Sequence, residues 1–222
     1  RPIAEGDSFV QPDLARVLSA IRLGGAIDLY RGTLARDLAA AAKAAGGSLE
    51  TSDLAAYRAD WRPAVALKLG FRTAYFAPPP AAAGVVEAQM LAMLDGAVGF
   101  GGGSADRLHA LAEAGMRAYA DRARWLRSDN SSSDSLAALV SSSGMDRLTR
   151  GFDRARHTAP ASLSPSLTVR PENPAATSFS IVDRTGLAVS CALTMNNSFG
   201  TGRMARGMGI MLAAVPNAQG RG

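Results

Sequence analysis

Residues 176–202 read ATSFSIVDRTGLAVSCALTMNNSFGTG and carry the clearest β pattern of the chain. Two β-rich runs, residues 178–183 and 187–194, flank the turn sequence Asp183-Arg184-Thr185-Gly186, as expected for a β-hairpin. A third β-rich run follows at residues 209–213. The sequence therefore predicts that the last part of the chain belongs to a sheet.

Helical patterns dominate the residues before this hairpin. An apolar stripe with helical spacing begins after Pro12, ends at Gly24-Gly25, and consists of Leu14, Val17, Leu18 and Ile21. Four further helices are predicted over residues 33–45, 52–57, 85–98 and 104–126. Ser52 is the expected N-cap of the short one, and a strand pair over residues 64–68 and 72–76 turns at Gly70. Helices first and strands later indicate an α+β layered fold.

Composition divides the chain into three expected parts. Residues 1–127 form a helical and hairpin portion, and residues 175–222 hold the later hairpin. Between them, residues 128–174 are rich in serine and spaced by proline, with weak helical pieces at 135–140 and 145–156. We expect this middle part to be an exposed connecting segment.

The charge pattern argues against a nucleic-acid partner. The net charge is +5 and the isoelectric point near 10.0, but only Lys43 and Lys68 are lysines and aromatic residues make up 6% of the chain. The arginines are scattered among alanines rather than gathered in a basic stripe with interleaved aromatics. His109 and His157 lack neighbours at metal-ligand spacing, so no metal is expected. The single Cys191 excludes an internal disulfide and is predicted to lie in a core.

Membrane insertion is not expected, because no run of about 18 uncharged apolar residues occurs. The first seven residues also lack the apolar stretch of a signal peptide. The chain opens in mid-pattern at Arg1 and stops in a Gly/Arg tail, which suggests a fragment of something longer.

A series of motifs then follows the order and spacing of a known family. They are FVQPDLA at 9–15, LYRGTLA at 29–35, GG at 46–47, DLAAY at 53–57, APPP at 77–80, YADR at 119–122 and TMNNSFGTG at 194–202. In these motifs the chain resembles the central segment of the γ-glutamyltranspeptidase family, spanning its autocleavage site. The resemblance implies part of an N-terminal-nucleophile hydrolase-type αββα sandwich, in which two sheets lie between helix layers.

The resemblance also implies a chemistry. The family is made as a precursor that cuts itself and exposes a threonine, whose own α-amine then serves as the base for its hydroxyl. It transfers the γ-glutamyl group of glutathione-like donors to water or an amino acceptor, without metal or cofactor. The implied partners are a small γ-glutamyl substrate and the remainder of the parent protein, and the implied compartment in bacteria is periplasmic or extracellular.

The cut site departs from the family pattern Thr-x-His-x-Ser-Val-Val-Asp. Aligned on Ser180-Ile181-Val182-Asp183, the nucleophile position holds Ala176, which cannot attack a carbonyl. Thr177 is the obvious substitute, but alternation along a strand points it to the other face unless a β-bulge lies between Thr177 and Ser180. Three explanations stay open: a nucleophile shifted to Thr177, a silent relative, or an introduced Thr-to-Ala change that traps the precursor.

Two matched positions remain. By resemblance, Thr194 supports the nucleophile and Asn196 contacts the substrate, and strand alternation would place both on one face. A neutral Asn217 stands near the expected acid that binds the substrate amine and cannot make a charge-assisted bond to it. The family's substrate arginine and oxyanion residues fall outside the chain, so the chain alone is not expected to catalyse the reaction. Asp121-Arg122 is predicted to be a structural ion pair or cap inside a helical layer.

Overall fold

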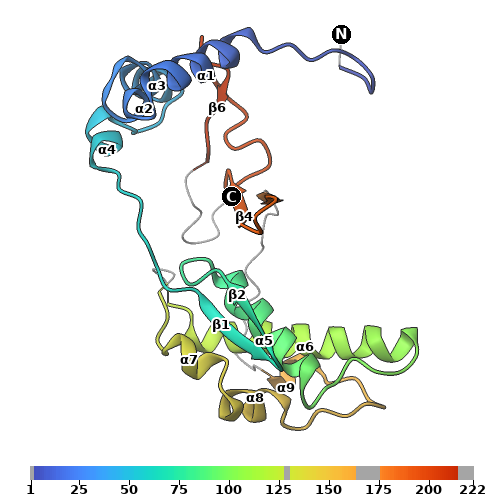
Figure 1. Cartoon of the computed structure of the whole chain (residues 1–222). Coiled ribbons are helices and arrows are strands. Elements are labelled where there is room, and N and C mark those ends of the chain that lie inside the picture. The colour runs from blue at the N-terminus through green and yellow to red at the C-terminus, as the bar shows by residue number, and fades with distance from the viewer. Residues whose placement is uncertain (1–2, 128–130, 164–175, 215–222) are drawn as a thin grey trace. The chain divides into compact units, whose positions relative to one another are not determined.

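The computed structural model describes residues 3–127, 131–163 and 176–214 (Figure 1). The chain divides into two compact units, one made of residues 1–59 with 170–222 and the other of residues 60–169. Within the described ranges, helices and strands are mixed as predicted, and no helix combines the length and apolar character that a membrane span requires.

The first unit begins with a layer of helices. They are α1 (Pro12–Gly24), α2 (Ile27–Arg31), α3 (Thr33–Ala44) and α4 (Thr51–Ala56). Three of the four confirm predicted helices, whereas α2 was missed because five residues are too few for a periodic pattern. The predicted N-cap of α4 is wrong: Glu50 caps it in a capping box with Asp53, whose carboxylate accepts the Glu50 amide at 2.9 Å, and Ser52 lies inside the helix.

A small strand pair completes the core of this unit. β5 (Met204–Ala205) pairs antiparallel with β6 (Ile210–Met211), and Ala205 and Met208 are buried against Val17 of α1 and Leu34 of α3. Gly209 has φ +68, and a Cβ there would lie 2.7 Å from the Leu14 backbone nitrogen. Only glycine therefore allows the turn between β5 and β6 to approach α1 so closely.

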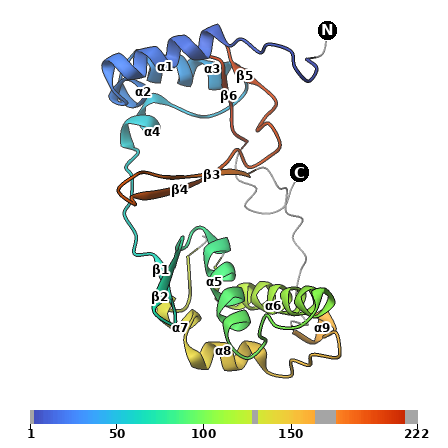
Figure 2. The same ribbon diagram turned by 45° about the vertical axis from the view of Figure 1, so that its right-hand side comes forward.

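The predicted hairpin is confirmed as β3 (Ala176–Val182) and β4 (Ala188–Thr194), seen edge-on in Figure 2. Its turn is closed by Asp183, whose Oδ1 accepts the Thr185 amide and hydroxyl at 2.8 Å each and the Leu187 amide at 3.0 Å. The Thr185 and Leu187 hydrogen bonds lower the pKa of Asp183. An ionised Asp183 thus fixes where the strands reverse and sets their register.

The second unit is mainly helical. Its elements are β1 (Val65–Leu69), β2 (Arg72–Phe76), α5 (Ala82–Asp95), α6 (Ser104–Trp125), α7 (Leu136–Leu139), α8 (Ser142–Thr149) and α9 (Pro160–Leu163). β1 and β2 form the predicted antiparallel pair. α5 begins three residues before the predicted start and ends before Gly96, while α6 matches its prediction within one residue.

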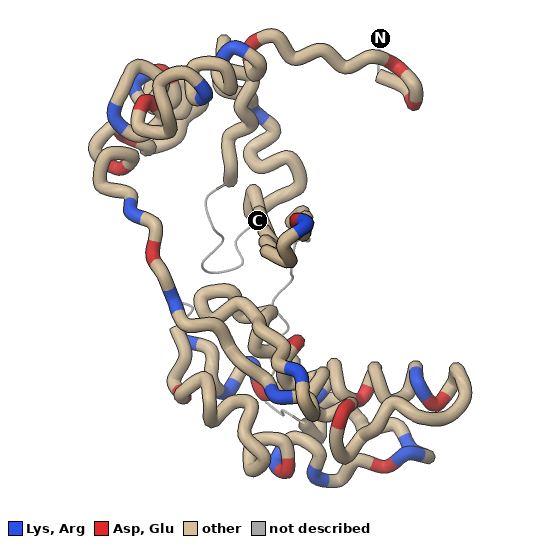
Figure 3. The backbone as a smooth tube through the Cα atoms, viewed as in Figure 1, with Lys and Arg blue, Asp and Glu red and all other residues tan. Residues whose placement is uncertain are grey.

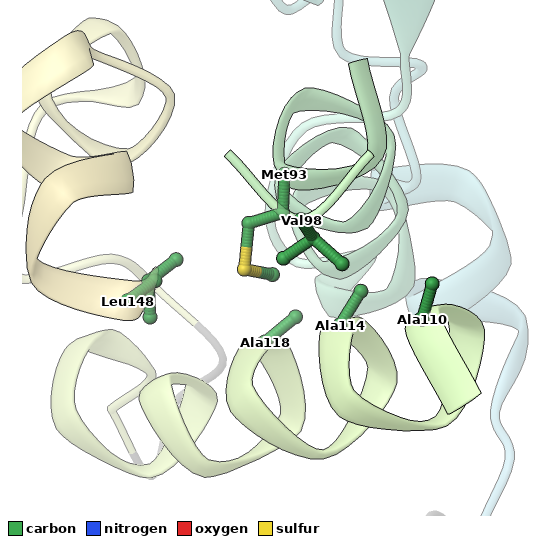
Figure 4. Close-up of a cluster of buried hydrophobic side chains, with 6 residues drawn as sticks. All are labelled: Met93, Val98, Ala110, Ala114, Ala118 and Leu148. Atoms are coloured by element: carbon green, nitrogen blue, oxygen red, sulfur yellow. The ribbon is translucent and has the colours of Figure 1, made fainter. Parts of the chain in front are cut away.

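Two apolar clusters hold this unit together. In the first, small residues of α6 at i, i+4 spacing let α5 and α8 pack closely, as Figure 4 shows for Met93, Val98, Ala110, Ala114, Ala118 and Leu148. The second surrounds Trp125, which is fully buried with Val65, Val85 and Leu139. Leu139 and Leu148 come from the serine-rich region, so these parts of it are buried rather than exposed. The predicted boundaries at residues 127/128 and 174/175 stay predictions.

Candidate functional site

The β3–β4 hairpin presents two chemically different faces. Directly paired residues of antiparallel strands point to the same side of a sheet. One side, which we call the small-residue face, carries the pairs Ala176↔Thr194, Ser178↔Ala192, Ser180↔Ser190 and Val182↔Ala188. The other, the apolar face, carries Thr177↔Leu193, Phe179↔Cys191 and Ile181↔Val189. A 3.0 Å hydrogen bond from the Ser180 hydroxyl to that of Ser190 fits this assignment.

Ala176 and Thr177 therefore lie on opposite faces. Ala176 forms the first pair of the ladder and stands across from Thr194, where the resemblance expects the nucleophile. Thr177 stands across from Leu193 on the apolar face. The ladder runs without interruption from Ala176 to Val182, so the described hairpin has no bulge that would turn Thr177 toward Thr194. The assignment of Thr177 as nucleophile stays a prediction that must account for this facing.

Thr194 and Asn196 are joined by a hydrogen bond. The Asn196 amide donates to Thr194 Oγ1 at 3.0 Å, which leaves the hydroxyl hydrogen of Thr194 free to donate on the face shared with Ala176. β4 ends at Thr194 and Asn196 has φ 61, so strand alternation does not extend to Asn196. Instead, its side-chain Nδ2 donates to the Ala214 carbonyl at 2.9 Å.

The sequence did not point to Ala214, because no pattern links residues 18 positions apart in two loops. Asn217, which stands near the position where the resemblance expects an acid, lies outside the described residues. The structure thus brings Ala176, Thr194, Asn196 and Ala214 to one end of the hairpin and places Thr177 on its reverse.

The buried carboxylates of α6 lie in the other unit and are structural. Burial acts to raise the pKa of Glu113, but hydrogen bonds from Thr158 and the charge of Arg117 outweigh it and leave the pKa below its usual value. Arg117 is itself buried and donates to the carbonyls of Leu148 and Arg150, at 2.9 and 3.0 Å. These contacts hold the charges of Glu113 and Arg117 in a buried, hydrogen-bonded pair that stabilises the packing around α6.

Asp121 behaves in the same way. Burial acts to raise its pKa, but hydrogen bonds from Arg124 and Gln89, with the charge of Arg147, hold it below the usual range. The prediction of a structural ion pair is right for Asp121 but names the wrong partner. Arg122 lies over the Tyr119 ring, 5.2 Å from its centroid, while Arg124 and Arg147 bind the carboxylate at 2.7 and 3.1 Å.

The two histidines also make structural contacts. His109 Nε2 lies 3.0 Å from the Asp153 carbonyl and its ring stacks on Phe152, while His157 Nδ1 lies 3.3 Å from Glu113. Within the described ranges, no group of three or more His, Cys, Asp and Glu residues is arranged to hold a metal ion. Figure 3 shows acidic and basic residues interspersed along the described chain.

Comparison with known proteins gives a consistent result. The family described as gamma-glutamyltranspeptidase matches residues 1–215. A glutathione hydrolase proenzyme of Pseudomonas aeruginosa is 36% identical over 213 residues, covering 93% of this chain and 37% of that protein. The chain thus spans little more than a third of the length of this relative.

Solved structures agree with the family match. The gamma-glutamyltranspeptidase of Pseudomonas nitroreducens, complexed with L-DON, aligns with a TM-score of 0.63 at 30% identity, over 72% of this chain and 49% of that one. A cephalosporin acylase of Bacillus halodurans aligns with a TM-score of 0.72 over 94% of this chain and 37% of that one, at 21% identity, which bears on fold alone. These relatives confirm the predicted N-terminal-nucleophile hydrolase-type α+β fold, of which the chain is a part.

Proposed function

Because the chain belongs to the γ-glutamyltranspeptidase family, we propose that it is the cleavage-site segment of an enzyme that transfers γ-glutamyl groups to water or an amino acceptor. The observation that carries the proposal is the end of the β3–β4 hairpin, where Thr194 and Asn196 retain the family's residues beside the cut position. The donor is a small glutathione-like γ-glutamyl compound. The remaining catalytic groups belong to the rest of the parent protein.

In this proposal the chain activates itself by cleavage before Thr177. The Thr177 hydroxyl attacks the carbonyl carbon of Ala176, its proton passes to the departing amide nitrogen, and an ester replaces the peptide bond. Water then hydrolyses the ester to a carboxylate at Ala176 and a free amine and hydroxyl at Thr177. The two groups are neighbours along the chain, so this attack does not depend on the face to which Thr177 points.

The orientation of the Thr177 side chain can change after cleavage. In the intact strand, residue 177 is fixed by peptide bonds on both sides and its side chain lies on the apolar face. As an N-terminal residue it is held only by its carbonyl side. Rotation by about 120° about the Cα–C bond, one of the two soft torsions of the backbone, then moves the amine, the side chain and the hydrogen of Cα each into the place of the next, so that the side chain leaves the apolar face. The hydroxyl can thereby reach the face of Thr194 with its own amine beside it as the base.

A second candidate is a silent relative that keeps the sandwich for binding or assembly. The observation that favours it is Ala176, which stands directly across from Thr194 and replaces a hydroxyl with a methyl group. In that case the chain stays intact and no acyl-enzyme forms.

Mass spectrometry of the full-length parent protein separates the two candidates. The enzyme proposal predicts two fragments, the second beginning at Thr177, and turnover of a γ-glutamyl anilide that disappears in T177A. An intact chain after prolonged incubation, with no turnover, would establish the silent relative instead. Cleavage before a residue other than Thr177 would remove Thr177 from its role while leaving the family reaction in place.

A further inference from the structure

The helical unit of residues 60–169 has a hollow of about 630 Å³ lined by parts of α6, α9 and the end of α8. Both α8 and α9 pack against α6, as the lower part of the ribbon in Figure 2 shows. Four of the charged residues that line the hollow are basic and one is acidic, namely Arg117, Arg124, Arg147, Arg150 and Asp121. A hollow with this lining attracts negatively charged ligands.

Part of this positive charge is already used inside the protein. Arg117 pairs with the buried Glu113, and Arg124 binds both Asp121 and Asp134. Arg147 donates to Asp121 through Nη2 alone, so within the described ranges its Nε and Nη1 have no acceptor. These three arginines therefore leave few free donors, and those belong to Arg147.

Arg150 is exposed and supplies the remaining charge. In the part of the chain that the structure describes, its guanidinium group makes no hydrogen bond and no ion pair. Its backbone is nevertheless fixed, because Arg117 Nη1 donates to the carbonyls of Leu148 and Arg150 at 2.9 and 3.0 Å. These bonds also satisfy carbonyl groups at the end of α8 that would otherwise repel an anion. Arg147 and Arg150 thus offer free guanidinium donors to an oxyanion, whose geometry they match.

An apolar hollow of about 370 Å³ adjoins the first one along α6 and α9. The two hollows share Ala120 and Leu163 in their linings. Gly115 leaves the space for the apolar hollow, because a Cβ there would meet only Met90 Cε, at 3.6 Å. Both hollows have the size of small-molecule sites, and they differ in polarity.

We propose that the two hollows together bind a small amphiphilic oxyanion, a molecule that joins a phosphate or carboxylate group to an apolar body. The oxyanion accepts hydrogen bonds from Arg147 and Arg150. The apolar body lies over Leu163 and enters the hollow at Gly115. Charge complementarity selects the head of the ligand and apolar burial selects its body. The site lies within one unit and requires neither cleavage nor γ-glutamyl transfer, so it does not rest on the proposed function.

Two variants separate the head of the ligand from its body. R150Q removes a charge that has no partner among the described residues, so it should leave the fold intact. G115L fills the apolar hollow, and leucine is favoured over glycine inside a helix. R107Q removes an exposed charge from the same helix at a residue that lines neither hollow, and it serves as the matched control for R150Q.

Titration calorimetry of the full-length protein tests the proposal with three probes, which are hexyl phosphate, inorganic phosphate and the uncharged hexyl glucoside. Hexyl phosphate should bind about tenfold tighter than inorganic phosphate or more, because its methylene groups are buried. R150Q should weaken the binding of both phosphates by about fivefold or more. G115L should weaken the binding of hexyl phosphate alone, and R107Q should change neither affinity by more than about twofold.

Several results would overturn the proposal. Equal weakening by R150Q and R107Q would mean attraction by the net charge alone. Hexyl glucoside that binds as tightly as hexyl phosphate would mean an apolar surface without anion recognition, and failure of hexyl phosphate to bind would mean that the parent protein covers the hollows. Hexyl phosphate binding with the expected response to R150Q and G115L, in a parent protein without turnover, would support this site and contradict the proposed function.

Discussion

The helical unit of residues 60–169 and the β3–β4 hairpin use polar residues in opposite ways. In the helical unit, Glu113 and Arg117 are 0% and 2% exposed, and hydrogen bonds satisfy the charges of both. In the hairpin, every residue of β3 is exposed, and its serines and threonines lie on surfaces open to another molecule or another part of the parent protein. Substitutions in the first region should therefore act on stability, and those in the second on chemistry.

The largest expected effect is a loss of turnover from a substitution in the β3–β4 hairpin. In the enzyme proposal, T177A removes both the attacking hydroxyl and the cleavage site. Turnover of a γ-glutamyl anilide should fall by at least about a thousandfold, since loss of a nucleophile leaves only residual catalysis. The thermal midpoint should hardly change, because Thr177 is exposed. Turnover that survives in T177A would show that another group is the nucleophile.

A reciprocal variant asks whether the small-residue face keeps a working geometry. A176T places a hydroxyl directly across from Thr194, where the family motif has its threonine. We expect the precursor to be cut before residue 176 instead of residue 177, which N-terminal mass spectrometry detects. If A176T is never cut before residue 176, restoring the hydroxyl is not sufficient. The end of the hairpin then lacks another feature that self-cleavage needs.

The next effect in size concerns stability in the helical unit. R117M leaves Glu113 buried with less compensation and frees the Leu148 and Arg150 carbonyls from their donor. Removing one partner of a buried pair typically costs about 3–5 kcal/mol. Urea unfolding of the full-length protein should show a lowered midpoint with an unchanged slope.

R107M supplies the matched control, since Arg107 lies exposed on the same helix α6. Its free energy of unfolding should stay within about 0.5 kcal/mol of the original value. Equal effects of R107M and R117M would contradict the structural role of the buried pair. They would also remove the contrast between the two regions.

The same contrast explains what the sequence predicted well. Apolar spacing predicted α1, α3 and α6 within a residue or two, and alternation with turn residues predicted the hairpin, because these signals are local. The register then places Ala176, the residue at the expected cut, across from Thr194. The sequence also identified Ala176 as the residue that departs from the family pattern, since the absence of a hydroxyl is visible without a structure.

The contacts that the sequence could not predict join distant residues. Glu113 and Arg117 read as an ordinary i, i+4 surface pair, but Thr158, 45 residues after Glu113, buries the carboxylate. Asn196 likewise reaches Ala214 across two loops. Such pairings depend on how whole elements pack, and no spacing rule within one element reveals them.

A smaller effect on the free energy of unfolding is expected when the pH is lowered. The pKa values of Glu113 and Asp121 lie below their ordinary values of 4.5 and 3.8, so the unfolded chain takes up protons at a higher pH than the folded one. Their contribution to stability is therefore present above about pH 5 and is lost as the pH falls through the folded pKa values, by at most about 1.4 kcal/mol per pH unit for each group. Urea midpoints measured from pH 7 to pH 3 should be level and then decline.

The double variant E113Q/D121N checks the origin of this decline. It lacks both carboxyl groups, so its stability should be lower at pH 7 and should fall less steeply below pH 4.5. An unchanged slope would assign the acid sensitivity to other groups and leave these two carboxylates without their inferred part in stability.

The smallest effect is expected from S180A and completes the comparison. Ser180 and Ser190 share one exposed hydrogen bond, and water replaces an exposed bond at little free-energy cost. The free energy of unfolding should change by less than about 0.5 kcal/mol, and turnover by less than about twofold, because Ser180 lies three residues beyond Thr177. A loss of more than about 2 kcal/mol in the full-length protein would mean that the parent buries the small-residue face. The small-residue face of the hairpin would then be an internal surface of the parent protein. Ala176 would be a core residue instead of a site residue.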